Sequence, residues 1–300
     1  MDPPSPSLPE MPSPDSPIVV TGAGSCDLAS EPDATPFLRT RKMRKLVGPW
    51  DRMAIVAAAQ ALEQAGLEAP LGPTAGLYTC VGHVPLKAPI MDSLLEDSTD
   101  EQGRFRDALY AKGGYFNFNP FWTFGSLTNA PAFFVSSCFD VQGPYFVTFA
   151  ETGEFYLALE EAIRSLRDGD CRLALVVGVA DQDNDMVRFH FERIQRPVPA
   201  ERLRSGAGVL VLETAEAAAA RGAAPRARLA ELAIDYTPFD PLLEEPEFDE
   251  RFEPPGPCSD AYWGPSSLPM SLAAAAPGEL RHQADTRTGI RVRSRWEVLA

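Results

Sequence analysis

The sequence predicts an α/β protein built from layers of helices and strands. Amphipathic helical patterns alternate with short apolar strand patterns along most of the chain, which is typical of α/β layering. Two of the strand patterns are continuously apolar, as in strands that are covered on both faces. With 300 residues and 45% hydrophobic content, the chain can bury a sizeable core as one large domain or two small ones.

The N-terminal region is expected to begin with a disordered arm, residues 1–17, because this segment is rich in proline and serine. A β-branched run that ends in glycine then predicts a strand from residue 18. Apolar residues at helical spacing over 50–66 predict a helix with a glycine stop. The apolar run 76–81 predicts a buried strand.

The middle of the chain is harder to assign. Residues 98–111 are compatible with a helix, and an aromatic, Asn-rich stretch follows over 115–129, where the rings favour burial. The run 145–150 predicts a strand. At residues 151–153 the apolar period changes, and one apolar stripe then predicts a helix that ends near Gly169.

The next segment supplies the two continuous apolar runs, 173–179 and 206–212, followed by an Ala-rich helix over 215–221. Residues 236–259 are acidic and Pro-rich, which predicts a surface loop or linker.

The C-terminal segment, residues 260–300, is expected to hold two elements. A short helix is predicted over 266–276. The strict alternation of residues 289–298 predicts a half-exposed strand.

Charge and motifs exclude several classes of function. The formal net charge of −15, from 42 acidic and 27 basic residues, would repel nucleic acid and anionic membranes. No apolar run approaches the roughly 18 residues of a membrane span, and no secretion signal is visible. Five widely spaced cysteines suit free thiols in a reducing cytoplasm, where we expect the protein to work. No cofactor or metal motif is found, so neither group is expected.

One local exception to the acidic character is a basic cluster near residue 40. A solvated charged face is its ordinary explanation, and a docking patch for an acidic partner is the sharper one. The cluster consists of Arg39, Arg41, Lys42, Arg44 and Lys45.

Five segments in order resemble the N-terminal half of β-ketoacyl synthases: IVVTGAG, WDRMAIVAAAQALEQAGL, GLYTCVG, NPFWTFGSLTNAPAFFVSSCFDVQGP and RSGAGVLVLETAEAAAARGA. The resemblance implies a thiolase-like layered fold, with helices between and around mixed sheets and a shortened C-terminal half. It also implies a ketosynthase-like N-terminal domain over 18–235, followed by the linker and a reduced C-terminal segment.

The position of the family's catalytic cysteine is the informative departure. The cysteine lies between a strand that follows Gly-Pro and the next helix, where the helix N-terminus stabilises a thiolate. Glu151 occupies that place here, followed by Thr152 and Gly153. A carboxylate cannot form the acyl thioester, and Cys138, before the strand, is expected to be a buried small hydrophobe.

A second departure concerns the family's two catalytic histidines, which lie in His-Gly-Thr and Gly-His-Thr contexts. His83, His190 and His282 are the histidines of this chain, and none has such flanks. His190 is expected to be an ordinary core or surface residue. We therefore expect no condensing activity from the chain on its own.

Three interpretations of Glu151 remain open. It could stabilise the helix N-terminus, where a carboxylate contributes about 0.3 to 1 kcal/mol. It could mimic an acylated cysteine, as glutamine does in relatives that decarboxylate malonyl groups or act as chain-length factors. It could also act as a general base, which requires a pKa raised by burial.

The resemblance also implies a partner. Ketosynthase-like folds dimerise through the strand before the elbow, and the uncharged aromatic composition here would make a poor exposed edge. The strand residues are Tyr145, Phe146, Val147, Thr148 and Phe149.

We expect either a heterodimer with an active ketosynthase, with the chain acting like a chain-length factor in polyketide or fatty-acid biosynthesis, or a homodimer. Acyl carrier protein would then dock mainly on the partner. The alternative is a divergent thiolase-fold enzyme, a malonyl-carrier-protein decarboxylase or acyl transferase, that uses Glu151.

Overall fold

The computed structural model describes residues 16–85, 92, 95–117, 127–192, 198–238, 248–256 and 258–300. The expected N-terminal arm therefore lies almost wholly outside the described residues, as does the centre of the aromatic stretch. The division of the chain at residues 235 and 259 stays a prediction.

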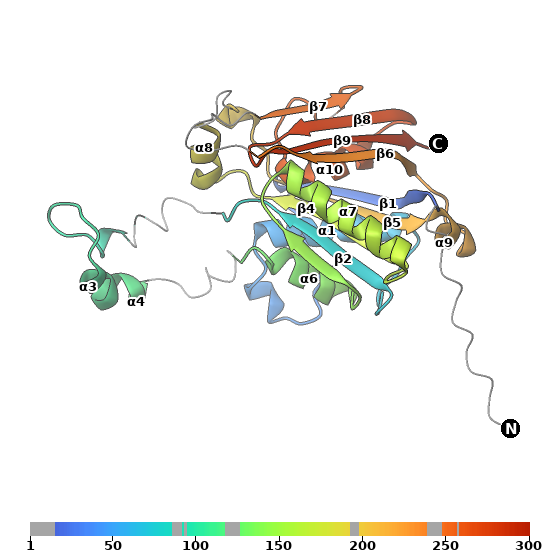
Figure 1. Cartoon of the computed structure of the whole chain (residues 1–300). Coiled ribbons are helices and arrows are strands. Elements are labelled where there is room, and N and C mark those ends of the chain that lie inside the picture. Colours follow the sequence, from blue (N-terminus) through green and yellow to red (C-terminus); the bar gives the residue numbers. More distant parts are fainter. Residues whose placement is uncertain are drawn as a thin grey trace.

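Within these residues, nine strands form one mixed sheet in the order β3-β2-β4-β5-β1-β6-β9-β8-β7 (Figure 1). β2 pairs in parallel with β3 and β4, and the other pairings are antiparallel. The strands are β1 (Ile18–Asp27), β2 (Ala75–Val81), β3 (Tyr145–Thr148), β4 (Leu173–Ala180), β5 (Gly206–Thr214), β6 (Ala227–Tyr236), β7 (Asp249–Glu253), β8 (Gly278–Asp285) and β9 (Ile290–Val298).

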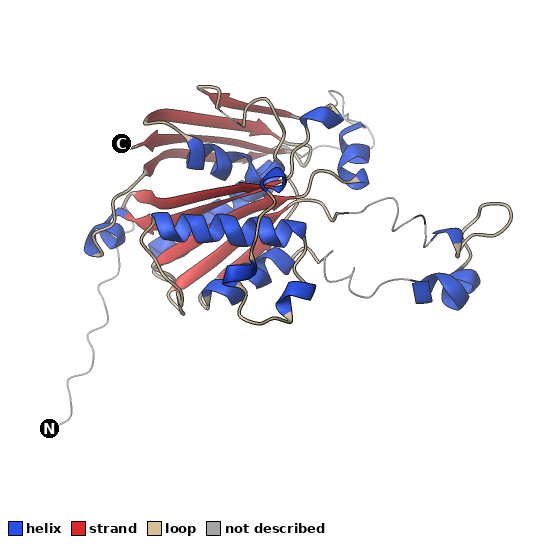
Figure 2. Cartoon of the chain, turned by 180° about the vertical axis from the view of Figure 1, so that it is seen from behind, coloured by secondary structure: helices blue, strands red, loops and turns tan. Residues whose placement is uncertain are grey.

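The larger helices of the described residues pack on the sheet (Figure 2). The longer ones are α1 (Pro49–Gln64), α6 (Ala130–Phe139), α7 (Thr152–Asp168), α8 (Asp185–Glu192), α9 (Ala215–Ala220) and α10 (Ser267–Ala274). Two single turns, α3 (Asp107–Leu109) and α4 (Tyr115–Asn117), flank a π-helical turn over Tyr110–Gly114.

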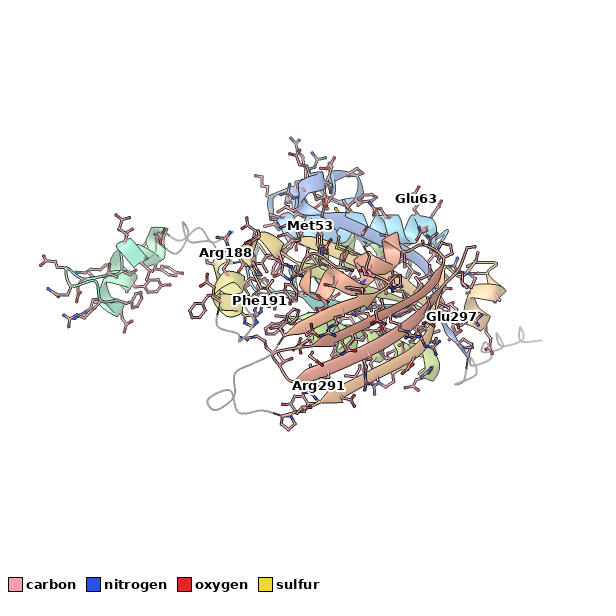
Figure 3. All side chains as sticks on the ribbon, turned by 90° about the horizontal axis from the view of Figure 1, so that it is seen from above. Met53, Glu63, Arg188, Phe191, Arg291 and Glu297 are labelled. Atoms are coloured by element: carbon pink, nitrogen blue, oxygen red, sulfur yellow. The ribbon has the colours of Figure 1, made fainter. Side chains whose placement is uncertain are left out.

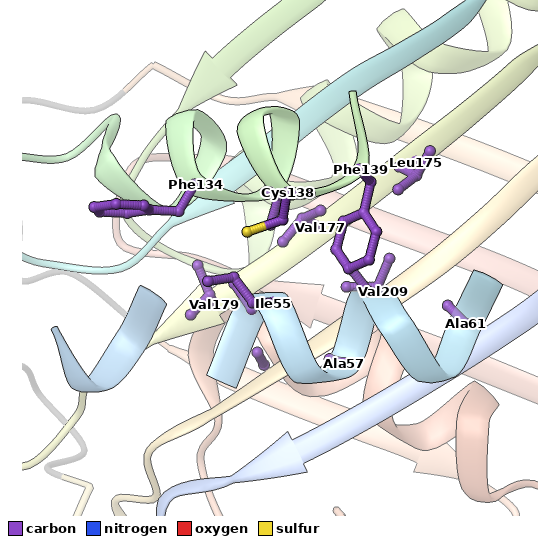
Figure 4. Close-up of a cluster of buried hydrophobic side chains, with 14 of the residues drawn as sticks. Ile55, Ala57, Ala61, Phe134, Cys138, Phe139, Leu175, Val177, Val179 and Val209 are labelled. Atoms are coloured by element: carbon purple, nitrogen blue, oxygen red, sulfur yellow. The ribbon is translucent and has the colours of Figure 1, made fainter. Parts of the chain in front are cut away.

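A first hydrophobic core lies between α1 and α6 and the strands β2, β4 and β5 (Figure 4). Helix α1 packs directly on the backbone of β1, because β1 presents glycine to it. A Cβ added at Gly22 would lie 2.0 Å from the carbonyl oxygen of Ala61, and one at Gly24 would lie 2.1 Å from that of Ala57. Any larger residue at these positions would push the helix off the sheet.

The sheet can be described as two parts, β3-β2-β4-β5-β1 and β6-β9-β8-β7, and a second core lies between them. Helix α7 contacts β2 and β4 on one side and β8 and β9 on the other, and α10 packs on β1 and β5. The large side chains of Phe155 on α7, Leu268 on α10 and Trp296 on β9 are fully buried there. Helix α7 is thus held by both parts of the sheet, which fixes the position of its N-terminus.

The outer face of the β6–β9–β8–β7 part is charged rather than apolar (Figure 3). Burial alternates along β9, with Val292 and Trp296 facing the core and Arg291 and Arg293 facing outward. This alternation confirms the half-exposed strand expected over 289–298. Ion pairs such as Arg293–Asp235 at 3.3 Å cross the outer face.

The α/β layering and most of the expected elements are confirmed, but the helix expected over 98–111 is wrong. The chain there makes a tight hairpin-like turn, with Thr99 bridged to Phe105. The side chain of Asp100 accepts the backbone N–H groups of Gln102 and Arg104, and Gly103 adopts a φ of 72°. Helical turns begin only at Asp107.

Strands β6 and β8 and helix α6 are additions that the apolar pattern did not predict. Segment 236–259, expected to be a loop or linker, contributes the short strand β7 at the edge of the sheet. Every second residue of β8 is exposed, and the strand is rich in charged residues, so its hydrophobic signal is weak.

Candidate functional site

The elbow between β3 and α7 is formed as expected, with Glu151 as the residue that precedes the first turn of the helix. Glu151 has an extended backbone (φ −120°, ψ −178°), and helix α7 begins at Thr152. The backbone N–H of Glu151 donates to Oε2 of Glu154 at 3.2 Å. Oε1 of the Glu151 carboxylate points toward two histidines.

Four side chains from four parts of the chain meet at the elbow. Oε1 of Glu151 lies 2.5 Å from Nε2 of His190 on α8 and 4.0 Å from Nε2 of His83, which follows β2. It also lies 3.5 Å from Nε of Arg287, in the turn between β8 and β9. The two imidazole rings are 4.5 Å apart between centroids. We call His83, Glu151, His190 and Arg287 the elbow cluster.

The elbow cluster is largely withdrawn from solvent, and this perturbs its acid–base behaviour. Only 2% of Glu151 is exposed. Burial alone would raise the pKa of Glu151, but the hydrogen bond and charge of His190, with Arg287 and His83 nearby, lower it overall. Burial and the neighbouring His190 lower the pKa of His83 to about 4. Burial, followed by the charge of Glu151, raises the pKa of Glu154.

Several polar atoms of the elbow cluster lack a hydrogen-bond partner within the described residues: Nε2 of His83, Oε2 of Glu151 and Nε of Arg287. A buried polar group without a partner costs about 1–3 kcal/mol, so native proteins rarely gather such groups. Two of these atoms, Nε2 of His83 and Nε of Arg287, lie 4.0 Å and 3.5 Å from Oε1 of Glu151.

The thiol nearest to this place in space is that of Cys80 on β2. Its sulfur lies 3.6 Å from the backbone carbonyl oxygen of Glu151. Cys80 is fully buried, and burial, followed by the charges of Glu154 and Glu151, raises its pKa well above the ordinary thiol value. It therefore stays a neutral thiol and cannot serve as a thiolate nucleophile. Cys138 lies in the first core on α6, as a buried small hydrophobe (Figure 4).

A second histidine–carboxylate centre lies further along α7. The hydroxyl of Tyr156 hydrogen-bonds Nδ1 of His282 at 2.6 Å and Oγ of Ser294 at 2.7 Å. Nε2 of His282 lies 3.1 Å from Oε1 of Glu250, and the imidazole stacks on Phe252. We call Tyr156, Glu250, His282 and Ser294 the inner cluster. Each of these side chains has polar partners.

The two residues after Glu151 have structural contacts. The hydroxyl of Thr152 lies 3.2 Å from Oε1 of Glu250 and 3.1 Å from the carbonyl oxygen of Gly264, which links the elbow to the inner cluster. A Cβ added at Gly153 would lie 3.0 Å from Cβ of Ile290. Glycine at this position thus allows α7 to pack closely on β9.

The strand expected to form an interface is an edge of the sheet. β3 pairs only with β2, at the end of the strand order. Tyr145 and Phe149 are 67% and 59% exposed, Phe146 is also exposed, and Val147 and Thr148 are half-buried. Phe133 on the neighbouring α6 is exposed too. This arrangement leaves an uncharged aromatic edge open on the surface of the single chain.

The basic cluster lies around a short 3-10 turn, Met43–Lys45, away from β3 in the sequence. All five basic side chains are exposed, and Arg39 pairs with Asp140 at 3.0 Å. The structure does not bring this cluster into the elbow.

Sequence reasoning identified Glu151 but missed His83, His190 and Arg287. One signal was available for His83. β2 and β3 are parallel, and His83 and Glu151 each follow one of them, so both lie at the carboxyl edge of the sheet, where α/β proteins gather functional residues. His190 lies on a separate helix and Arg287 in a turn near the C-terminus, and no local sequence pattern predicts their approach to Glu151.

Comparison with known proteins identifies the family. Residues 14–205 match the family model described as Beta-ketoacyl synthase, N-terminal domain. No curated protein matches the chain.

Solved structures of ketosynthases share the fold. The AntDE:AntF structure, a type II PKS acyl-carrier protein in complex with its ketosynthase bound to the hexaketide, has a TM-score of 0.66 and 13% identity, covering 95% of this chain and 100% of that one. The ishigamide ketosynthase/chain length factor has a TM-score of 0.64 and 16% sequence identity, and the match again covers 95% of this chain and 100% of that one. A β-ketoacyl synthase from Burkholderia phymatum has a TM-score of 0.54 and 17% sequence identity. That match covers 74% of this chain and 64% of the other. The thiolase-like fold expected from the sequence is confirmed.

Among the described residues, no helix is both long enough and apolar enough to cross a membrane.

Proposed function

The chain belongs to the β-ketoacyl synthase family, and we propose that it is a non-elongating member that works beside an active ketosynthase. In this role it resembles a chain-length factor in polyketide or fatty-acid biosynthesis, as part of a cytoplasmic complex. The observation that carries the proposal is Glu151 at the elbow, in the place where the family holds its nucleophile.

The chemistry of the elbow supports a non-elongating role. Condensation needs a thiolate that accepts the acyl chain as a thioester, and the carboxylate of Glu151 cannot provide one. Cys80 lies beside the elbow, but its buried neutral thiol faces the backbone of Glu151. His83 and His190 both face Glu151, so they are not placed to activate another side chain as a nucleophile.

The exposed edge of β3 supports a partner. Exposed, uncharged aromatic edge strands promote association, and natural proteins usually cover them. Two of the similar structures are described as a ketosynthase with its acyl-carrier protein and as a ketosynthase/chain length factor. We propose that Tyr145, Phe146 and Phe149 pack against the same strand of an active ketosynthase, with a homodimer as the other arrangement.

Charge supports an indirect role in docking of the carrier protein. A net charge of −15 would repel an acidic carrier over most of the surface. The exposed cluster of Arg39, Arg41, Lys42, Arg44 and Lys45 is the exception, and we propose it as a secondary contact. The main docking surface would then belong to the partner.

Co-expression with Cys-bearing ketosynthases, followed by size-exclusion chromatography with mass detection, tests the partner. We expect a one-to-one complex that Tyr145→Glu disrupts. Tyr236→Glu is the matched control, because Tyr236 is equally exposed (67% for each) but lies on β6. A chain that stays apart from every ketosynthase, or a complex that is equally sensitive to both substitutions, would reject the proposed interface.

A second candidate is an enzyme that uses Glu151 to decarboxylate malonyl-carrier protein or to transfer an acyl group, although the net lowering of the pKa of Glu151 argues against a role as general base. The supporting observation is the contact of 2.5 Å between Glu151 and His190, with unpartnered atoms around it. Turnover of malonyl-carrier protein by the isolated chain, abolished in Glu151→Gln, would favour this candidate over the first.

A further inference from the structure

We propose that His83, Glu151 and His190 form a binding site for a single divalent transition-metal ion of the zinc class. The two imidazoles and one carboxylate offer one ligand atom each, and these atoms all lie within 4.8 Å of one another. Two histidines and one glutamate are a donor set that zinc and related ions use in proteins.

The distances suit such an ion after small side-chain adjustments. Around a tetrahedral zinc ion with bonds of about 2.0–2.1 Å, ligand atoms lie about 3.3 Å apart. Oε1 of Glu151 lies 2.5 Å from Nε2 of His190 and 4.0 Å from Nε2 of His83, so the present separations lie on either side of that value. Drawing His83 inward and letting His190 move back would bring all three ligand atoms to one centre.

The polar atoms at the site are those that a metal would satisfy. Oε2 of Glu151 is buried without a hydrogen-bond partner, and Nε2 of His83 is in the same condition. Their side chains are 2% and 23% exposed, so water reaches them poorly. A cation bound through Oε1 would pair Nε2 of His83 directly and would neutralise the carboxylate that carries Oε2.

The inner cluster shows that the unpartnered atoms are not a general property of histidines in this fold. His282 has both ring nitrogens engaged, with Tyr156 and Glu250. It therefore offers no free ligand atom, although a glutamate lies beside it. In the elbow cluster the ligand atoms are directed at one another, and Nε2 of His83 has no hydrogen-bond partner among the described residues.

Among the described residues of the site, Arg287 opposes a cation. Its Nε lies 3.5 Å from Oε1 of Glu151, and its positive charge lowers the affinity of the carboxylate for a metal. The same charge stabilises Glu151 when no metal is bound. Removing it should therefore strengthen metal binding, which is the reverse of what loss of a ligand would do.

Three protein ligands leave a coordination position open on a tetrahedral ion, as in catalytic zinc sites. Nε of Arg287 lies 3.5 Å from the carboxylate that would bind the metal, so an anionic oxygen bound to the metal on that side would contact the guanidinium as well. The site would then take a carboxylate-bearing or carbonyl-bearing molecule at the elbow. It is independent of whether the chain has a ketosynthase partner.

Metal binding by the whole chain is the test. The protein is stripped with a chelator, dialysed against Zn²⁺, and its metal content is measured by mass spectrometry. A parallel titration with Co²⁺ reads the visible absorption bands of the bound ion. We expect one equivalent of metal, and a loss of affinity of about 100-fold or more in His83→Asn and in Glu151→Gln.

Two further variants complete the design. Glu154→Gln is the matched control, because Glu154 is a buried glutamate one turn along the same helix and is not a ligand. It should keep the full equivalent, and Arg287→Gln should bind more tightly than the unchanged protein. Circular dichroism of each variant verifies that it is folded, and His83→Asn, at a partly exposed site, serves if Glu151→Gln does not fold.

Absence of stoichiometric binding by the unchanged protein would overturn the proposal. So would binding that survives in His83→Asn, since the metal would then be held elsewhere, for example by the cysteines. Weaker binding in Arg287→Gln would also contradict it, because the guanidinium would then support the site instead of opposing the cation.

Discussion

The elbow cluster and the inner cluster both place a histidine and a glutamate against helix α7, yet they differ in how completely their polar atoms are paired. In the inner cluster, Tyr156, His282 and Glu250 form a chain of hydrogen bonds that continues to Ser294. In the elbow cluster, His83 and Glu151 keep unpartnered atoms. The two lie close together, because Thr152 contacts Glu250.

The difference separates two uses of the same residue types. A buried polar network whose members are all paired stabilises one arrangement of a core, and its loss is costly. A buried network in which some polar atoms lack hydrogen-bond partners contributes less to stability, and those atoms remain able to bind a ligand. On this basis we infer that the inner cluster holds α7 between the two parts of the sheet and that the elbow cluster binds a ligand.

The largest expected effect is that of His282→Ala. The substitution removes one hydrogen-bond partner each from Tyr156 and Glu250 and opens a cavity beside Phe252, so we expect a loss of about 3–5 kcal/mol in the free energy of unfolding. Urea denaturation measures it. A loss below about 1 kcal/mol would show that the inner cluster does not hold the fold.

Asp51, at the start of α1, is an intermediate case that sharpens the comparison. Its Oδ2 accepts the backbone N–H of Gly48 at 2.7 Å, while its buried Oδ1 lacks a partner. Burial raises the pKa of Asp51 to about 7. Because the folded-state pKa exceeds the unfolded value, protonation of Asp51 stabilises the folded state. This stabilisation is complete below about pH 4 and is lost as the pH rises through about 7.

The test compares the unchanged protein with Asp51→Asn by urea denaturation at pH 4.5 and pH 8. Asparagine keeps the acceptor for Gly48 but has no charge to bury, so the variant should gain on the unchanged protein at pH 8, by at most about 4 kcal/mol. The two should differ little at pH 4.5. An equal difference at both pH values would show that Asp51 is not the titrating group.

Tyr156→Phe is expected to have a smaller effect than His282→Ala. It keeps the ring but removes the hydroxyl shared by His282 and Ser294, so we expect a loss of about 1–3 kcal/mol. Thermal and urea unfolding measure it. A double-mutant cycle with Ser294→Ala should show coupling, and strict additivity would mean that the hydrogen bonds are not a connected network.

His83→Asn should have the smallest effect on stability. Nε2 of His83 has no hydrogen-bond partner to lose, and its side chain is 23% exposed, so a change below about 1 kcal/mol is expected. Urea denaturation without added metal checks this value. A loss as large as that of Tyr156→Phe would make the elbow cluster a structural network like the inner one.

The sequence predicted the parts of the molecule whose signal is local. Continuous apolar runs identified β4 and β5, and the change of period at Glu151 identified the start of α7. The charged alternation of β8 carried no such signal, since its burial depends on α7 and β9 packing on one face. Asp100 and Gly103 were read as parts of a helix, although together they favour a turn.

The candidate site was predicted only in part, for a related reason. Glu151 could be found because it replaces a residue at a recognisable elbow. His83 and His190 lie in segments that sequence patterns treat separately, and Arg287 belongs to a turn near the C-terminus. The pairing of β2 with β3 brings His83 near Glu151, the packing of α7 against β8 and β9 brings Arg287 to it, and His190 reaches it from α8.

The central claim is that the elbow cannot carry an acyl thioester, and intact-protein mass spectrometry tests it most directly. The co-purified complex with a ketosynthase is incubated with acyl-carrier protein, beside a complex that contains Glu151→Cys as the positive control. We predict that the ketosynthase gains the acyl mass, that this chain does not, and that Glu151→Cys allows it to do so. An acyl adduct on the unchanged chain would contradict the account.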